Sequence, residues 1–153
     1  MSENRIRLHA IVDRARQTFR AQACSILVHE PASRSLMFAA MSGEGSESIG
    51  ATESLVGVKI PDSAGVAGWV LATREPLFLD DVANDRRFAD DIAETIGYVP
   101  RRLMAMPLLL EDRALGVLEV LDCPEQAGFT ETDQLADFAD EAVLALADLG
   151  LAE

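Results

Sequence analysis

Residues that carry redox or metal chemistry are scarce in this sequence of 153 residues, which contains two cysteines and two histidines. Neither a zinc-type spacing nor a cluster of histidine and cysteine occurs, so we expect no metal site. Cys24 and Cys123 lie far apart in the sequence, unlike the cysteines of a secreted disulfide framework. They act either as buried small hydrophobes, which is the favoured interpretation, or as a redox-sensing pair where neighbouring strands meet.

Basic residues and long apolar runs are scarce as well. Thirteen lysines and arginines stand against 26 acids, which gives a formal charge of −13. This charge repels phosphate backbones and anionic lipids, so we expect neither nucleic acid nor membrane as a partner. The apolar runs are far shorter than the roughly 20 residues of a membrane span, and residues 1–17 lack the apolar segment of a signal peptide. We therefore expect a cytoplasmic protein, and its length predicts one domain over residues 1–153.

The most informative stretch consists of two apolar runs, Leu103–Leu110 and 114–121, joined by the polar residues 111–113. Short apolar runs around a tight polar turn predict a β-hairpin. Both faces of the first run are apolar, which places the hairpin in the middle of a sheet that is covered on both sides. Pro107 lacks the N–H that a strand ladder needs, so we expect a bulge or an irregular segment beside it.

Glu119 is an acid within the second of these runs. It falls in the row that Leu115, Val117 and Leu121 form on one face of the predicted strand. A carboxylate in that row lies at an open mouth, pairs with a group at a site, or occupies a solvated edge.

Periodicity and turn residues predict the remaining elements. Helices are predicted at residues 4–19, 65–73 and 130–149. Further strands are predicted at residues 23–29, 35–41, 56–60 and 77–79. Asp62 or Ser63 is the expected N-cap of the middle helix. Residues 80–102 form a connection with a short helix inside it, and connections of that length are usually functional or disordered.

The order of these elements and five short motifs resemble the GAF domain, a small-molecule-sensing relative of the PAS fold. The resemblance covers residues 7–149. The motifs are IPDSAGVAGWVLATREPLFLDD (60–81), NDRRF (84–88), IGYVPRRLMAMPL (96–108), LGVLEVLD (115–122) and FTETDQ (129–134). It implies an α+β fold with a six-stranded antiparallel sheet. The terminal helices would cover one face, and residues 65–73 and 80–102 would form the lid of a ligand pocket on the other.

The resemblance also indicates where a ligand would bind. In members that bind cyclic nucleotides, the positions matching Glu119, Asp81 and Val82 contact the ligand. Aromatic side chains near the implied cavity are more often plain core than ligand contacts, and we expect one or two of them to line it. The candidate ligand-binding residues are Trp69, Phe78, Asp81, Val82, Phe88, Ile92, Ile96, Tyr98, Leu103 and Glu119.

Departures from those members disfavour a cyclic nucleotide as the ligand. This sequence has Ala93, Ile96 and Pro100 where they place polar groups, and Asp122-Cys123 where they have an Asn-Lys pair. A nucleotide ring and phosphate need several fixed hydrogen bonds, which alanine, isoleucine and proline side chains do not supply.

The same resemblance argues against an enzyme or a cofactor carrier. Bilin attachment needs a cysteine near the lid, haem ligation usually needs a histidine in the cavity, and the free methionine sulfoxide reductase branch uses pocket cysteines. Residues 30–122 contain neither cysteine nor histidine. The pairs Asp80-Asp81 and Asp90-Asp91 are expected to cap the connection and its helix, beside nearby arginines, rather than to perform acid–base chemistry.

We therefore expect a non-enzymatic sensory domain that binds a small, fairly apolar metabolite between lid and sheet, without a cofactor. The terminal helices would form a homodimer and relay closure of the lid to the partner or to a separate output protein. The alternative is a ligand-free module that dimerises or docks other proteins. Cyclic-nucleotide binding and redox sensing are less favoured hypotheses.

Overall fold

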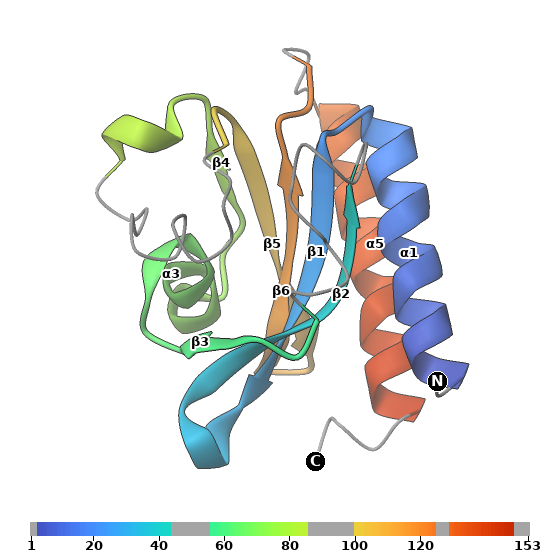
Figure 1. Cartoon of the computed structure of the whole chain (residues 1–153), viewed down its shortest axis with the longest axis vertical. Helices are drawn as coiled ribbons and strands as arrows, with labels where there is room; N and C mark the ends of the chain where they lie inside the picture. Colours follow the sequence, from blue (N-terminus) through green and yellow to red (C-terminus); the bar gives the residue numbers. More distant parts are fainter. Residues whose placement is uncertain (1–2, 44–55, 86–99, 125–128, 149–153) are drawn as a thin grey trace.

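A six-stranded antiparallel sheet forms the centre of the computed structural model, which describes residues 3–43, 56–85, 100–124 and 129–148 (Figure 1). The strand order is β3-β2-β1-β6-β5-β4. The strands are β1 (Ala23–Glu30), β2 (Ser35–Gly43), β3 (Lys59–Pro61), β4 (Leu77–Leu79), β5 (Leu103–Leu110) and β6 (Arg113–Leu121). The helices of the described residues are α1 (Glu3–Phe19), α3 (Gly65–Thr73) and α5 (Phe129–Asp148), with short 3-10 turns η1 (Pro31–Ser33) and η2 (Val82–Asn84).

The helices form layers on the two faces of the sheet. Helices α1 and α5 lie side by side on one face, and α3 lies on the other (Figure 1). The two long helices are antiparallel, since Arg7 near the start of α1 pairs with Asp148 at the end of α5, with Nη1 and Oδ2 2.8 Å apart. Near the other end of the pair, the Phe19 and Phe138 rings meet edge to face with centroids 6.0 Å apart. The predicted α+β fold with a six-stranded antiparallel sheet is confirmed.

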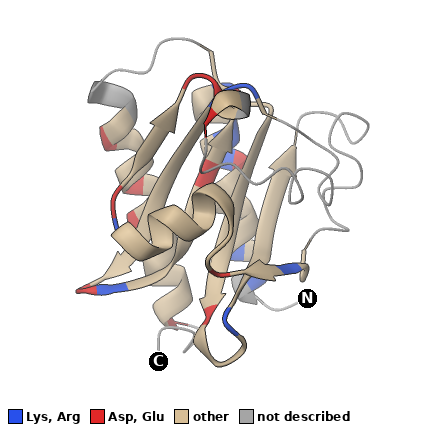
Figure 2. Cartoon of the chain, turned by 90° about the vertical axis from the view of Figure 1, so that its left-hand side faces the viewer, with Lys and Arg blue, Asp and Glu red and all other residues tan. Residues whose placement is uncertain are grey.

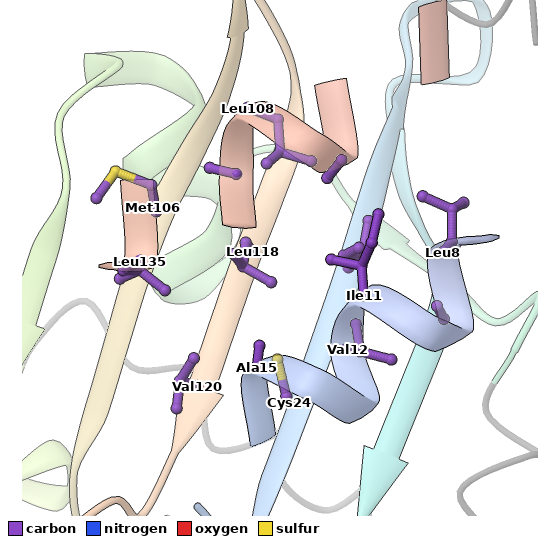
Figure 3. Close-up of a cluster of buried hydrophobic side chains, with 14 of the residues drawn as sticks. Leu8, Ile11, Val12, Ala15, Cys24, Met106, Leu108, Leu118, Val120 and Leu135 are labelled. Atoms are coloured by element: carbon purple, nitrogen blue, oxygen red, sulfur yellow. The ribbon is translucent and has the colours of Figure 1, made fainter. Parts of the chain in front are cut away.

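Side chains along the central strands alternate between two buried layers. The layer under α1 and α5, here called the helix-side layer, includes Cys24 of β1 and Leu118 and Val120 of β6 (Figure 3). The layer under α3, here called the α3-side layer, includes Leu27 of β1 and Val117 of β6. The sheet is therefore buried on both faces, as the apolar runs of the hairpin predicted.

Gly116 allows β6 and β1 to approach closely. A Cβ atom at this position would lie 2.0 Å from the carbonyl oxygen of Leu27, so a side chain would force the strands apart. Next to it, the pairing of β5 with β6 skips Leu115, which forms a β-bulge. The extra residue reverses the alternation and turns Leu115 into the helix-side layer. The prediction that Leu115 shares a row with Glu119 is therefore wrong.

The start of α3 also differs from its prediction, although its bounds agree. The N-cap is Ala64, and no side chain caps the helix. Asp62 is occupied elsewhere, because its Oδ2 lies 2.9 Å from Nε2 of His29. The turn folds back onto the helix so tightly that a Cβ at Gly68 would lie 2.6 Å from the carbonyl carbon of Ser63. The absence of a side chain at Gly68 therefore allows α3 to lie close against this turn.

Charge is distributed unevenly on the α3 side of the molecule. The sheet and α3 are mostly uncharged, and charged residues gather at strand ends and in turns (Figure 2). In the described part of the chain, no helix combines the length and the apolar composition that crossing a membrane requires.

Candidate ligand-binding face

Glu119 lies on the face of β6 that α3 covers. Its neighbours two residues away, Val117 and Leu121, belong to the α3-side layer, and residues two apart on a strand share a face. Across the sheet it is paired with Ser25 of β1 and Ala105 of β5. Directly paired residues have Cβ atoms about 4.5–5.5 Å apart, so the Ser25 side chain is a lateral neighbour of the carboxylate.

The environment of Glu119 disfavours the charged form of its carboxyl group. Burial raises the pKa of Glu119 from 4.5 to about 7, because apolar surroundings solvate an ionised carboxylate poorly. Among the described residues, none forms a hydrogen bond or ion pair with this carboxylate. Glu119 is half-buried. A partly desolvated acid without a partner lowers stability, and acids with strongly raised pKa values concentrate at functional sites. Glu119 is therefore the residue around which a candidate site is built.

Hydrogen bonds fix the two ends of the connection between β4 and β5 beside this face. Asp122 Oδ1 accepts the backbone N–H groups of Arg101 and Arg102, at 2.7 and 2.9 Å. The Arg102 guanidinium donates to Asp80 Oδ1 through Nε at 3.1 Å and Nη2 at 3.0 Å. The N–H of Val82 donates to the carbonyl of Arg101 at 3.0 Å. As the sequence predicted, an acid at the start of the connection pairs with an arginine at its end.

Several predicted ligand-binding residues meet in the α3-side layer. Val82 and Leu103 are buried there, and Trp69 is half-buried against it. Glu119 joins them from β6. These side chains come from α3, η2, β5 and β6, so segments far apart in the sequence converge on one face.

Two other predicted residues are placed differently. Asp81 is exposed, and its Oδ2 accepts a hydrogen bond from Asn84 Nδ2 at 2.6 Å. Phe78 is 41% exposed and is paired with Met104, a residue of the helix-side layer. Strand alternation turns its neighbours Leu77 and Leu79 toward α3 instead. The structure therefore does not bring Phe78 to the face that carries Glu119.

The remaining candidates lie outside the described residues. These are Phe88, Ile92, Ile96 and Tyr98. The predicted cavity beneath residues 80–102 depends on the same segment, so it stays a prediction.

Sequence reasoning missed Ser25. It is 1% exposed and stands directly opposite Glu119 on the neighbouring strand. The available signal was a hydroxyl within an otherwise apolar strand, next to Cys24 and Ile26. The hydroxyl indicates a site residue only once the register between β1 and β6 is known, because the register pairs Ser25 with Glu119.

The two cysteines are free thiols buried in the helix-side layer. Burial raises the pKa of the Cys24 thiol far above its usual range, and the nearby Glu119 carboxylate acts in the same direction. The thiol therefore stays protonated, whereas thiol–disulfide exchange requires a thiolate. In the described part of the chain, no three His, Cys, Asp or Glu residues are grouped so that they could hold a metal ion.

The GAF domain family model matches residues 5–146, which is most of the sequence. This chain belongs to the GAF domain family. GAF domains are small-molecule-sensing and regulatory modules.

Curated relatives of this GAF domain are much longer proteins. The cone cGMP-specific 3',5'-cyclic phosphodiesterase subunit alpha' of Mus musculus is 26% identical over 133 residues, which cover 82% of this chain and 15% of that protein. The probable 3',5'-cyclic phosphodiesterase pde-5 of Caenorhabditis elegans is 29% identical over 77 residues, covering 50% of this chain and 10% of that protein. The chain thus spans a small fraction of the length of these relatives.

Solved GAF structures share the fold at low sequence identity. The GAF domain of a phosphoenolpyruvate-protein phosphotransferase from Coxiella burnetii has a TM-score of 0.81 and 18% identity, covering 97% of this chain and 84% of that one. Residues 122 to 287 of a methyl-accepting chemotaxis protein give a TM-score of 0.78 and 21% identity, with 99% and 93% covered. The free methionine-R-sulfoxide reductase from Neisseria meningitidis gives 0.75 and 18%, with 99% and 82% covered.

Proposed function

We propose that this GAF domain is a non-enzymatic sensor that binds a small, mostly apolar metabolite on the α3-covered face of the sheet. The observation that carries this proposal is Glu119, a carboxylate among apolar side chains with a pKa raised by burial. A ligand that donates a hydrogen bond to Glu119, or places a positive charge beside it, would compensate for the hydration that the carboxylate loses on folding. The apolar remainder of the ligand would pack against Val82 and Leu103, with Trp69 at the margin.

The polar part of the proposed site is small. Ser25 can donate or accept one further hydrogen bond next to Glu119, and Asp81 stands exposed at the start of η2. Pockets for small ligands are mostly apolar with a few placed polar groups, and this composition fits that description. Phe88, Ile92, Ile96 and Tyr98 remain candidates for the wall that residues 86–99 would supply.

A cyclic nucleotide is the less favoured ligand, although two relatives are named as cyclic-nucleotide phosphodiesterases. Ala93, Ile96 and Pro100 stand where cyclic-nucleotide-binding members place polar groups. These side chains supply no hydrogen bonds to a base or a cyclic phosphate, so we propose a metabolite with fewer polar groups.

A thermal-shift screen of the whole chain against a metabolite library, with cGMP and cAMP included, tests the proposal. A true ligand raises Tm progressively with concentration. At about 100 times Kd it adds about 2.7 kcal/mol, or roughly 5–10 °C for a domain of this size. Glu119→Gln should reduce the shift for the same ligand, whereas the exposed control Glu75→Gln should not. A library without any saturable shift would count against sensing.

The second candidate function is a ligand-free homodimerisation or docking module, and exposed apolar residues on the helix layer favour it. Ile6 of α1 is 56% exposed and Leu144 of α5 is 63% exposed. The groove between the two helices has a volume of about 370 Å³ and includes Leu144 in its lining. In the sensory proposal the same surface forms the homodimer and passes the signal to a partner or a separate output protein.

A further inference from the structure

A hollow lies at the opposite end of β6 from Glu119. It has a volume of about 240 Å³ and lies where the end of β1, the end of α3 and the start of β6 meet. Along β6, Arg113 and Glu119 are six residues apart, or about 20 Å at about 3.3 Å per residue. This pocket, here called the basic pocket, is lined by His29, Pro31, Leu71, Arg74, Arg113, Ala114 and Leu115.

All the charged or titratable side chains that line the basic pocket are basic types. Arg74 follows α3, Arg113 opens β6, and His29 lies near the end of β1. The chain has 26 acids and 13 lysines and arginines, so a pocket without a carboxylate in its lining contrasts with the rest of the surface. Three segments distant in sequence bring these groups together.

The two arginines of the basic pocket form no ion pair within the described residues. Four other basic residues pair with acids, namely Arg7, Arg14, Lys59 and Arg102. The exposed Arg20 and Arg34 also form no ion pair within the described residues. Arg74 also offsets the partial negative charge at the C-terminus of α3, which alone would explain its presence. Arg113 begins a strand and has no such role, so the convergence of both guanidinium groups needs another explanation.

The imidazole of His29 is held in place by an acid outside the lining. Its Nε2 lies 2.9 Å from Asp62 Oδ2, and both side chains are partly buried. This contact fixes the ring through one nitrogen. Glu75, Glu111 and Asp112 flank the arginines in sequence but do not line the basic pocket.

We propose that the basic pocket binds a small oxyanion, a phosphate or a carboxylate, through the Arg74 and Arg113 guanidinium groups. Guanidinium groups bind such anions through paired, charge-assisted hydrogen bonds. The volume of about 240 Å³ is below the roughly 300–1,000 Å³ of pockets for drug-sized ligands, so the anion is small and carries at most a short apolar body. Leu71, Ala114 and Leu115 supply the apolar part of the lining. This site is independent of the ligand proposed at Glu119.

Titration of the 15N-labelled chain with inorganic phosphate, and separately with acetate, tests the proposal at constant ionic strength with chloride as the balancing anion. We expect saturable shifts of the backbone amides of Leu71, Arg113 and Ala114 with at least one of the two anions. The double variant R74Q/R113Q should weaken this binding about tenfold or more. Arg74→Lys, which keeps the charge and loses the planar fork, should give an intermediate loss.

The matched control is R20Q/R34Q. These arginines are exposed, as Arg74 and Arg113 are, but they do not line the basic pocket. Their positive φ values of 55° and 53° are close to the 60° of Arg74. The control variant removes the same total charge but keeps both arginines of the basic pocket. Because the remaining effect is only that of general charge, the affinity should change less than about twofold. An equal loss in the control would reduce the effect to general charge and overturn the proposal. Shifts that fail to saturate with both anions in the wild-type chain would overturn it as well.

Discussion

At the scale of single residues, Glu119 and Ser25 distinguish this sheet from a plain hydrophobic core. One contributes a carboxyl group and the other a hydroxyl, on neighbouring central strands and on the face that α3 covers. Apolar residues at both positions would pack better and cost nothing in desolvation. Retaining two polar groups there is explained if the folded protein uses them to hold a third molecule.

Replacing Glu119 with glutamine should remove a pH dependence of stability. Its pKa is raised from 4.5 to about 7 on folding, so between these values the folded state holds a proton that the unfolded chain has released. The stabilisation is fully present below about pH 4.5 and is lost as the pH rises to about 7, with a total of about 3 kcal/mol. Urea unfolding from about pH 5 to about pH 8 should therefore show a steeper decline in the wild-type chain than in Glu119→Gln.

The control for this experiment is Glu75→Gln, at an exposed position. It should shift the stability curve of the wild-type chain by a small constant amount, if at all. Parallel curves for the wild-type chain and Glu119→Gln would contradict the raised pKa.

The sequence predicted Glu119 as a candidate because a carboxylate interrupts an apolar row. It could not place Phe78 or find Ser25, for two physical reasons. A three-residue strand such as β4 is too short for its alternation to show which side chains face α3. The cross-strand partner of a buried hydroxyl such as that of Ser25 depends on the strand register, which the sequence does not give. Register is set by bulges and close contacts, such as those at Leu115 and Gly116, that act between strands.

At the scale of elements, the turn after β6 organises the connection that precedes β5. Asp122 has a φ of 58° and accepts two backbone N–H groups from Arg101 and Arg102. A left-handed conformation is tolerated by aspartate and asparagine better than by most residues. This single side chain therefore joins the end of one strand to the start of the neighbouring strand.

Asp122→Ala should destabilise the fold by about 2 kcal/mol, because it removes two hydrogen bonds to a charged acceptor and leaves alanine at a positive φ. Asp122→Asn keeps an acceptor oxygen and the conformational preference, so it should cost less than half as much. Urea denaturation midpoints at unchanged m-value measure both effects. Equal losses in the two variants would show that the hydrogen bonds are not the stabilising feature.

Most elements could be predicted from the sequence, because apolar periodicity, together with proline, glycine and polar turn residues, marks where they begin and end. The bounds of α3, β4 and β5 agree with the predicted residues. The third strand is shorter than predicted, as it begins at Lys59 rather than at residue 56. The predicted N-cap of α3 is wrong because N-cap preference is judged from neighbouring residues alone. The Asp62 side chain instead contacts His29, which is 33 residues away in sequence.

At the scale of the whole molecule, the outer surface of α1 and α5 is the candidate for self-association. Ile6 and Leu144 are exposed apolar residues on these helices, and a groove of about 480 Å³ lies beside Ile6 between α1 and β2. Large exposed apolar side chains that gather on one surface mark interaction sites. A second copy of the chain would bury the same residues on both sides of a two-fold axis.

The variants Ile6→Asp and Leu144→Asp should convert a dimer to a monomer in sedimentation equilibrium, with little effect on the stability of the monomer because both positions are exposed. Leu109→Asp is the matched control, since Leu109 is 37% exposed but lies on β5. It should leave the dimer intact. A wild-type chain that remains monomeric at high concentration would rule out self-association through this surface.

The ion pair between Arg7 and Asp148 brings the first turns of α1 next to the last turn of α5. The start of α1 and the end of α5 are therefore neighbours, and a short peptide bridge between them would close residues 3–148 into a ring. Reopening that ring at Glu111-Asp112, in the tight turn between β5 and β6, would give a circular permutant with every strand ladder uncut. A permutant that folds to the same structure would show that the order in which the strands are synthesised does not decide how they pair.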